Sequence, residues 1–203
     1  MGTKVALVIL DQFADWEGAF IVNALNGGEI SRDNEVVWVS VDREPKRSIG
    51  GMTALPDLAI SEIPDDLDAL ILIGGDSWQS KEALAVVPVV EEFREAGKVI
   101  GFICDATYFA AEHGFLNDVW HTGNSADDLK KALGYANAEG FKWVDVVTDG
   151  RIVTANGNSP VEFAAHLLRA LEAADEDDIA MWYDFYTMGY VNALKKYGYL
   201  DPT

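Results

Sequence analysis

The sequence predicts an α/β protein with a mostly parallel central sheet. Residues 4–10, 67–73 and 99–103 form continuous apolar runs, which are typical of parallel strands buried on both faces. Helical periodicity lies between the second and third of these runs, over residues 80–96, and Gly97 ends it. Strands that alternate with helices of this length predict a sandwich with one sheet between helices.

The other segments fit the same plan. Their patterns predict strands over 36–41, 141–147 and 151–154, a small hairpin over 49–55, helices over 107–113, 126–133 and 161–173, and an aromatic helix from 179 to about 197. Ser125 and Ser159 are expected to cap two of these helices. Asp15 is expected to cap a helix that ends near Asn26, which would place Glu17 in its first turn.

Composition limits the possible partners and compartments. The 203 residues suit one domain, and 34 acidic against 15 basic residues give a formal net charge of -19. This charge argues against binding to nucleic acid or to anionic membranes. No secretory segment or apolar run near about 20 residues is present, so we expect a cytoplasmic protein. One cysteine cannot form an internal disulfide.

That cysteine, Cys104, follows the apolar run 99–103 directly and precedes residues suited to start a helix. A sharp strand-to-helix turn holds its side chain clear of both elements, and a helix N-terminus favours thiolate. Two interpretations of Cys104 are therefore open: it is a nucleophile, or it is a buried cysteine of the core. For the nucleophile we expect a thiol pKa well below the free value of about 8.5.

Three further residues follow strand ends in the same way. Glu17 lies after the first run, either as a favourable charge at a helix N-terminus or as a functional acid. Gly74 and Gly75 follow the run 67–73, either as a plain turn or as a place where the backbone approaches a ligand. Carboxyl ends of parallel strands meet at one sheet edge, so Glu17, Gly75 and Cys104 are expected to converge.

An ordered set of motifs adds a family resemblance. The motifs are Asp11 to Glu17, Ile73-Gly74-Gly75, Ile103-Cys104-Asp105-Ala106-Thr107, Ala111-Glu112-His113-Gly114-Phe115-Leu116, His121-Thr122, Thr154-Ala155-Asn156-Gly157 and Val161-Glu162-Phe163-Ala164. Together they resemble the PfpI intracellular protease and parkinsonism-associated deglycase family, over about residues 3–173. This resemblance implies a flavodoxin-like three-layer sandwich, with residues 1–203 forming one class I glutamine amidotransferase-like domain and 176–199 a C-terminal helical extension.

The resemblance also implies roles for particular residues. Cys104 would be the nucleophile on an elbow, and Glu17 the acid/base beside its sulfur. The N–H groups of Gly75 and Asp105, next to Gly74, would hold an oxyanion, and His121 would lie near the cysteine. Protease-like members carry a histidine directly after the cysteine, whereas this chain has Asp105 there. Proteolysis is therefore disfavoured.

The function expected from these roles is a cysteine-dependent hydrolase, lyase or hydratase acting on a small carbonyl, amide or isocyanide-like electrophile. The alternatives are a non-catalytic protein that senses oxidants through a reactive thiol, and an idle binding module. No cofactor is expected. No metal is expected either, because one cysteine and three scattered histidines show no ligand spacing.

The C-terminal stretch 181–190 is rich in aromatic residues and methionine. On one helix these side chains would occupy more than one face, so the domain alone cannot easily bury them. Packing within the same chain and a homodimer contact are both open. The resemblance favours a homodimer, because members of that family commonly form dimers.

Overall fold

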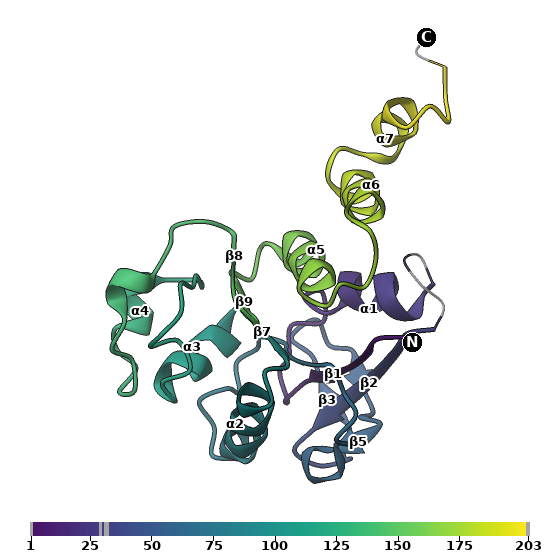
Figure 1. Ribbon diagram of the computed structural model, residues 1–203. Helices are drawn as coiled ribbons and strands as arrows, with labels where there is room; N and C mark the ends of the chain where they lie inside the picture. Colours follow the sequence, from purple (N-terminus) through teal and green to yellow (C-terminus); the bar gives the residue numbers. More distant parts are fainter. Residues whose placement is uncertain (1, 29, 31–32, 202–203) are drawn as a thin grey trace.

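The computed structural model describes residues 2–28, 30 and 33–201, and its centre is a sheet of seven strands in the order β5-β2-β1-β6-β7-β9-β8 (Figure 1). The strands are β1 (Lys4–Val8), β2 (Glu35–Ser40), β5 (Leu58–Ala59), β6 (Ala69–Leu72), β7 (Val99–Ile103), β8 (Val146–Asp149) and β9 (Ile152–Ala155). All neighbouring pairs are parallel except β8 and β9. The predicted α/β class with a mostly parallel sheet is confirmed.

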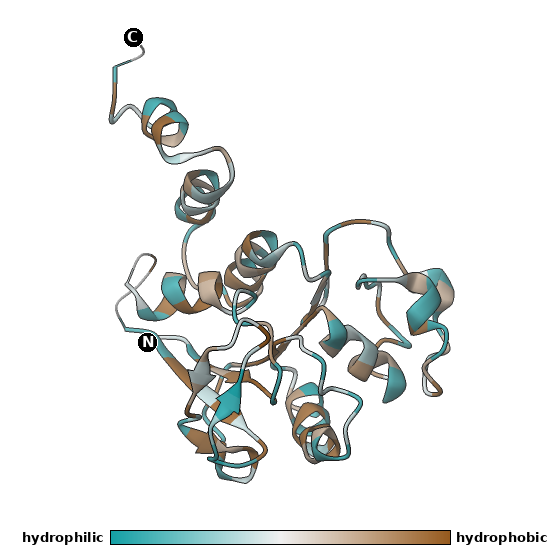
Figure 2. Cartoon of the chain, turned by 180° about the vertical axis from the view of Figure 1, so that it is seen from behind, coloured by the Kyte–Doolittle hydropathy of each residue, from teal (hydrophilic) through white to brown (hydrophobic). Residues whose placement is uncertain are grey.

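Helices cover both faces of the sheet, because the central strands present apolar side chains to both sides. On one face, α1 (Ala19–Asn26) and α5 (Pro160–Ala170) contribute to a core that includes Leu25 and Phe163. On the other, α2 (Val87–Glu95) and α3 (Asp105–Glu112) contribute to a core that includes Phe93 and Phe109. Figure 2 shows apolar residues concentrated in the strands and the inner sides of these helices. The three-layer sandwich is therefore confirmed.

The predicted hairpin and the short helix after Ser125 are present with shifted bounds, whereas the strand predicted over 141–147 lies at Val146–Asp149. The predicted hairpin is the antiparallel pair β3 (Lys46–Arg47) and β4 (Thr53–Ala54). Short helices are η1 (Ile60–Glu62), η2 (Glu82–Val86), α4 (Ala126–Leu129) and η3 (Ala138–Gly140). Ser125 caps α4 as predicted, since its hydroxyl accepts a hydrogen bond from the Asp128 N–H at 3.2 Å.

The prediction for Asp15 is wrong. Helix α1 begins at Ala19 with Gly18 as its N-cap, so Glu17 precedes the helix and does not lie in its first turn. The Asp15 carboxylate instead accepts a hydrogen bond from the Ser48 hydroxyl at 2.6 Å. This bond ties the segment after β1 to the β3–β4 hairpin.

The C-terminal segment forms two helices where the sequence predicted one. These are α6 (Glu176–Thr187) and α7 (Tyr190–Lys196), separated at Gly189, whose φ of +87° interrupts the helix. Helix α6 packs on α5 and α7 packs on α6, so the pair projects from the sandwich (Figure 1). Tyr190 and Tyr199 are exposed.

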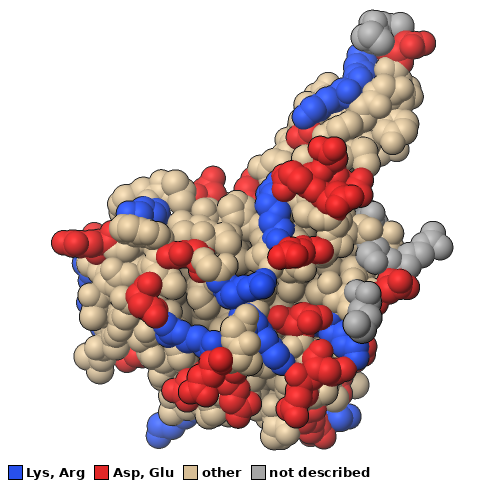
Figure 3. Space-filling view, in the orientation of Figure 1, with Lys and Arg blue, Asp and Glu red and all other residues tan. Residues whose placement is uncertain are grey.

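Acidic side chains are spread over the face seen in Figure 3, with basic side chains between them. None of the described helices combines the length and the hydropathy that a bilayer span requires.

Candidate active site

Cys104 occupies the turn between β7 and α3. Its φ of 59° and ψ of −129° place a non-glycine residue in a strained backbone region. Hydrogen bonds hold the turn: the Cys104 N–H donates to the Ala155 carbonyl at 3.0 Å, and the Thr107 hydroxyl donates to the Cys104 carbonyl at 2.6 Å. The thiol is consequently held at the carboxyl edge of the sheet and half-buried.

Glu17 lies beside the sulfur with no exposure to solvent. Its Oε2 accepts a hydrogen bond from the Gly74 N–H at 2.8 Å. Its Oε1 is buried and has no hydrogen-bond partner of good geometry in the described part of the chain. A Cβ on Gly157 would lie 2.9 Å from the Cys104 sulfur and 3.0 Å from this oxygen. The thiol and the unpartnered oxygen therefore face the same small space, which exists because residue 157 is glycine.

Burial dominates the electrostatics of this pair. Burial raises the pKa of Glu17 to about 7, against the opposing effects of the neighbouring Cys104 thiol and of the hydrogen bond from the Gly74 N–H. Burial, followed by the negative charge of Glu17, raises the pKa of the Cys104 thiol to about 12. The expected low thiol pKa is wrong in direction, because a buried carboxylate outweighs the helix N-terminus and none of the described Lys or Arg side chains acts on the sulfur. The two groups compete for one proton, so a thiolate near neutral pH requires a protonated Glu17.

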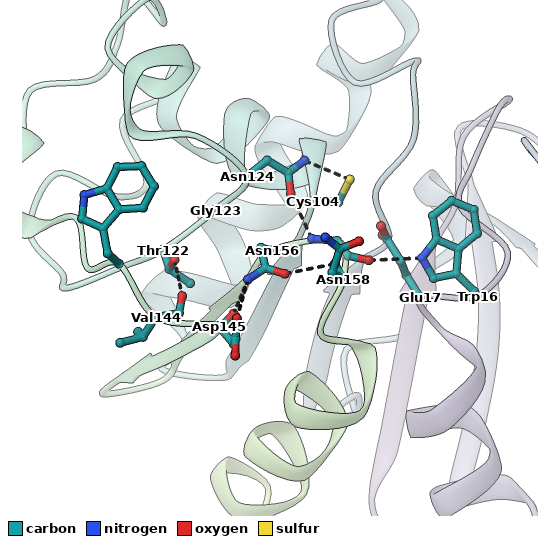
Figure 4. A pocket seen from close by; sticks show the side chains of 12 residues that line it. Trp16, Glu17, Cys104, Thr122, Gly123, Asn124, Val144, Asp145, Asn156 and Asn158 are labelled. Atoms are coloured by element: carbon teal, nitrogen blue, oxygen red, sulfur yellow. Dashed lines mark hydrogen bonds between the residues drawn. The ribbon is translucent and has the colours of Figure 1, made fainter. Parts of the chain in front are cut away.

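Asn124 is the third side chain at the sulfur, as Figure 4 shows. Its amide nitrogen donates to the Cys104 Sγ at 3.2 Å and lies 3.4 Å from the Asp105 carboxylate. Its amide oxygen accepts a hydrogen bond from the Gly157 N–H at 2.9 Å. Asn124 therefore joins the cysteine turn to the 156–158 loop and supplies a donor that stabilises thiolate. Sequence reasoning did not single out Asn124.

Two backbone N–H groups near the cysteine have no acceptor among the residues that the structure describes, those of Gly75 and Asp105. Gly75 faces Phe13 in an isolated bridge whose hydrogen bonds use the neighbouring residues and leave its own N–H free. Its φ of +150° favours glycine, and a Cβ would stand 2.4 Å from the Gln12 carbonyl. Asp105 is the first residue of α3, so its N–H has no intrahelical partner.

His121 does not reach the sulfur, and this prediction is wrong. Its side chain is fully buried, with Nδ1 2.9 Å from the Val119 carbonyl and Nε2 2.7 Å from the Tyr135 hydroxyl. The carbonyl can only accept, so Nδ1 carries the proton, whereas the single proton of the Tyr135 hydroxyl has both Nε2 and the Asn137 carbonyl, at 2.9 Å, within hydrogen-bond distance. Burial lowers the pKa of His121, which keeps the ring neutral.

A cavity of about 610 Å³ opens above the cysteine. Residues from five separate parts of the chain form its walls, including Trp16, Glu17, Cys104, Asn124, Trp143 and Asn156 (Figure 4). Its volume falls in the range of small-molecule sites. No group of three or more His, Cys, Asp or Glu residues in the described ranges is arranged to hold a metal ion.

The order of these elements matches a known family. Residues 3–170 match the family model described as DJ-1/PfpI family. The chain belongs to the DJ-1/PfpI family. Its sheet, its cysteine turn and the preceding Glu17 lie within the matched range, whereas α6 and α7 lie beyond it.

Relatives of this DJ-1/PfpI chain carry different activity names. It is similar to a Bacillus subtilis protein named "Uncharacterized protease YdeA", with 34% identity and 96% of both chains covered. It also resembles the "Glutathione-independent glyoxalase DJR-1.2" of Caenorhabditis elegans, with 27% identity over 70% of this chain and 76% of that one. The solved DJ-1 superfamily protein Atu0886 of Agrobacterium tumefaciens is 32% identical, with a TM-score of 0.83, 92% of this chain covered and 98% of that one.

Proposed function

We propose that the chain is a Cys104-dependent enzyme that acts on small carbonyl compounds. The observation that carries this proposal is the buried Oε1 of Glu17, which has no hydrogen-bond partner in the described structure and faces the cysteine sulfur. A protonated carboxyl with a pKa near neutral pH is suited to move a proton to and from a substrate. The glyoxalase name of one relative supports a carbonyl substrate.

The proposed reaction begins with transfer of the thiol proton to Glu17. The sulfur then bonds to the carbonyl carbon, and the electron pair of the C=O double bond moves to oxygen. The N–H groups of Gly75 and Asp105 are placed to hydrogen-bond this oxyanion, and Asn124 holds the sulfur before attack. Return of the proton to oxygen gives a hemithioacetal with all atoms balanced.

For a 2-oxoaldehyde the same carboxyl completes the reaction. Glu17 removes the proton from the carbon bonded to sulfur, the hydroxyl proton on that carbon passes to the neighbouring carbonyl oxygen, and Glu17 delivers its proton to the neighbouring carbon, which converts the hemithioacetal into a thioester. Water then hydrolyses the thioester and restores the thiol. The net reaction adds one water to the aldehyde and yields a 2-hydroxy acid, without any oxidant or reductant.

Proteolysis is less well supported, although two relatives have protease in their names. Cysteine proteases pair the sulfur with an imidazole. Here His121 is bonded to Val119 and Tyr135, and no histidine lines the cavity.

The test is turnover of methylglyoxal by the wild type, Cys104→Ser and Glu17→Gln, with lactate measured as the product. We expect lactate from the wild type only. Ser159→Ala serves as a control for a small polar change away from the sulfur. Lactate formation by Cys104→Ser, or none by the wild type, would contradict the proposal.

A further inference from the structure

Two indole rings line the cavity, those of Trp16 and Trp143. Trp16 is 45% exposed and Trp143 is 79% exposed. The Trp16 Nε1–H donates to the Gly157 carbonyl at 3.1 Å, which fixes the ring beside the cysteine (Figure 4). Trp143 packs edge-on against Phe141, with ring centroids 5.0 Å apart. Both rings therefore keep apolar surface available to a molecule in the cavity.

The wall also has a marked charge pattern. None of the 12 residues that line the cavity is Lys or Arg, whereas Glu17 and Asp145 contribute carboxyl groups. The Asp145 carboxylate accepts a hydrogen bond from Asn156 at 3.1 Å and has no ion-pair partner in the described ranges. The nearby Lys142 places its ammonium over the Trp120 ring at 3.5 Å. The cavity wall therefore has no positively charged side chain that would neutralise a bound anion.

The neutral polar groups complete the pattern. The cavity is lined by the side-chain amides of Asn124, Asn156 and Asn158. Amides hydrogen-bond uncharged oxygen and nitrogen atoms, whereas carboxylates and phosphates are normally held by arginine or lysine.

From these observations we infer that the site takes uncharged electrophiles that carry a flat apolar group, and that it discriminates against carboxylate and phosphate substrates. This inference rests on the proposed carbonyl chemistry for its reaction, but its binding part stands on the cavity wall alone. The indoles bind the flat group, and the Asp145 carboxylate repels anions.

Binding is tested on full-length Cys104→Ala, which cannot form a covalent adduct, with acetophenone, benzoate and acetone as probes followed by ligand-observed NMR. We expect acetophenone to bind about tenfold more tightly than benzoate, because like charges at a binding site are strongly unfavourable. Added salt is expected to narrow this difference by screening. Acetone, which lacks the ring, is expected to bind more weakly than acetophenone.

The matched variants are Trp143→Leu and Trp120→Leu, each of which removes one exposed indole. We expect Trp143→Leu to weaken acetophenone binding about three- to tenfold, the size of one aromatic contact. Trp120 lies outside the cavity, so Trp120→Leu is expected to leave binding unchanged. Equal binding of benzoate and acetophenone, or equal effects of the two substitutions, would overturn the inference.

Turnover separates this inference from the proposed function. With the wild type we expect phenylglyoxal to have a higher kcat/KM than methylglyoxal, and glyoxylate to have a lower one. Selective acetophenone binding without turnover of any aldehyde would refute the proposed function and leave the substrate class standing. Turnover of glyoxylate as efficient as that of methylglyoxal would refute the inferred substrate class and leave the proposed function standing.

Discussion

Replacing Glu17 by Gln separates the proton chemistry of this site from its nucleophile. Gln has nearly the same shape, and its amide oxygen can accept the Gly74 N–H that Glu17 Oε2 now accepts. Its NH₂ group then faces the sulfur, as the protonated carboxyl does in the wild type. The substitution thus imitates a Glu17 that never loses its proton.

The expected result is a difference in how the rate of Cys104 alkylation depends on pH. Below the Glu17 pKa of about 7, both proteins have a neutral donor at residue 17, so their thiolate fractions rise together. Above it, each new thiolate in the wild type requires a proton on Glu17, and the thiolate fraction becomes constant. In Glu17→Gln the thiolate fraction keeps rising about tenfold per pH unit. The variant should therefore be alkylated about tenfold faster than the wild type at pH 8 and about 100-fold faster at pH 9.

The assay is the second-order rate of reaction with iodoacetamide, an uncharged reagent, measured between pH 5.5 and 9 by mass spectrometry of the intact protein. Asp145→Asn is the control, because Asp145 shares the cavity without being a cause of the raised Cys104 pKa. The alkylation rate of Asp145→Asn is expected to level off near pH 7, as that of the wild type does. A wild-type rate that rises through pH 7–9 as steeply as that of Glu17→Gln would refute the reasoning.

The same pair predicts that lactate formation falls about 10²- to 10⁴-fold in Glu17→Gln, the usual loss when a general acid/base is removed, although alkylation becomes faster above pH 7. Stability should also depend on pH: the Glu17 pKa is raised from 4.5 to about 7 by folding, so the folded state binds more protons in that window and loses stability as pH rises through it. Between pH 4 and 8 the free energy of unfolding of Glu17→Gln, measured by chemical denaturation, should therefore rise by about 3 kcal/mol relative to that of the wild type, at about 1.4 kcal/mol per pKa unit. If the difference in unfolding free energy between the two proteins did not change with pH, the buried carboxyl would be contradicted. Gly157→Ala places a Cβ 2.9 Å from the Cys104 sulfur, so alkylation should slow about tenfold or more while circular dichroism stays unchanged, and an unaffected rate would show that the space is not the route to the sulfur. Finally, we propose that the chain forms a homodimer through the apolar surface of α6 and α7, where Tyr190 is 67% and Val191 56% exposed. Light scattering should give a dimer for the full chain and a monomer for a chain ending at Asp175, and a monomeric full chain would exclude the dimer.

The sequence predicted the fold well because its strongest signals are long and continuous. Residues 4–10, 67–73 and 99–103 became β1, β6 and β7, the central strands of the sheet. Parallel strands place their carboxyl ends at one edge of the sheet, and this rule alone predicted that Glu17 and Cys104 lie close together. Element ends were less predictable: the segment between Asp15 and Gly18 has helix-forming residues, but the Ser48 hydroxyl holds Asp15 outside the helix.

The part of the site that the sequence did not predict comes from loops. Asn124 and His121 are three residues apart, and either could have turned toward the sulfur. Burial against Tyr135 and Phe141 draws His121 into the core, and Asn124 consequently reaches Cys104. No local sequence pattern predicts which of the two side chains faces the sulfur, because the orientation of His121 depends on residues 14 and 20 positions further along the chain. The thiol pKa was missed although the resemblance places Glu17 beside the sulfur, because no sequence pattern shows that burial and the charge of this carboxyl outweigh the helix N-terminus.

The carboxyl partner of Cys104 also restricts the reactions that this site can support. Expulsion of an amine, as in proteolysis, requires a strong proton donor at the leaving nitrogen, a role that an imidazolium ordinarily fills. Among the described residues that contact the sulfur, only Glu17 titrates near neutral pH, and burial holds it there. A single carboxyl that receives the thiol proton and returns it to the same molecule suits additions and isomerisations, in which no leaving group has to be protonated. The pKa of Glu17 would then determine the working pH of the enzyme, and a substitution that moved it should move the pH dependence of turnover in the same direction.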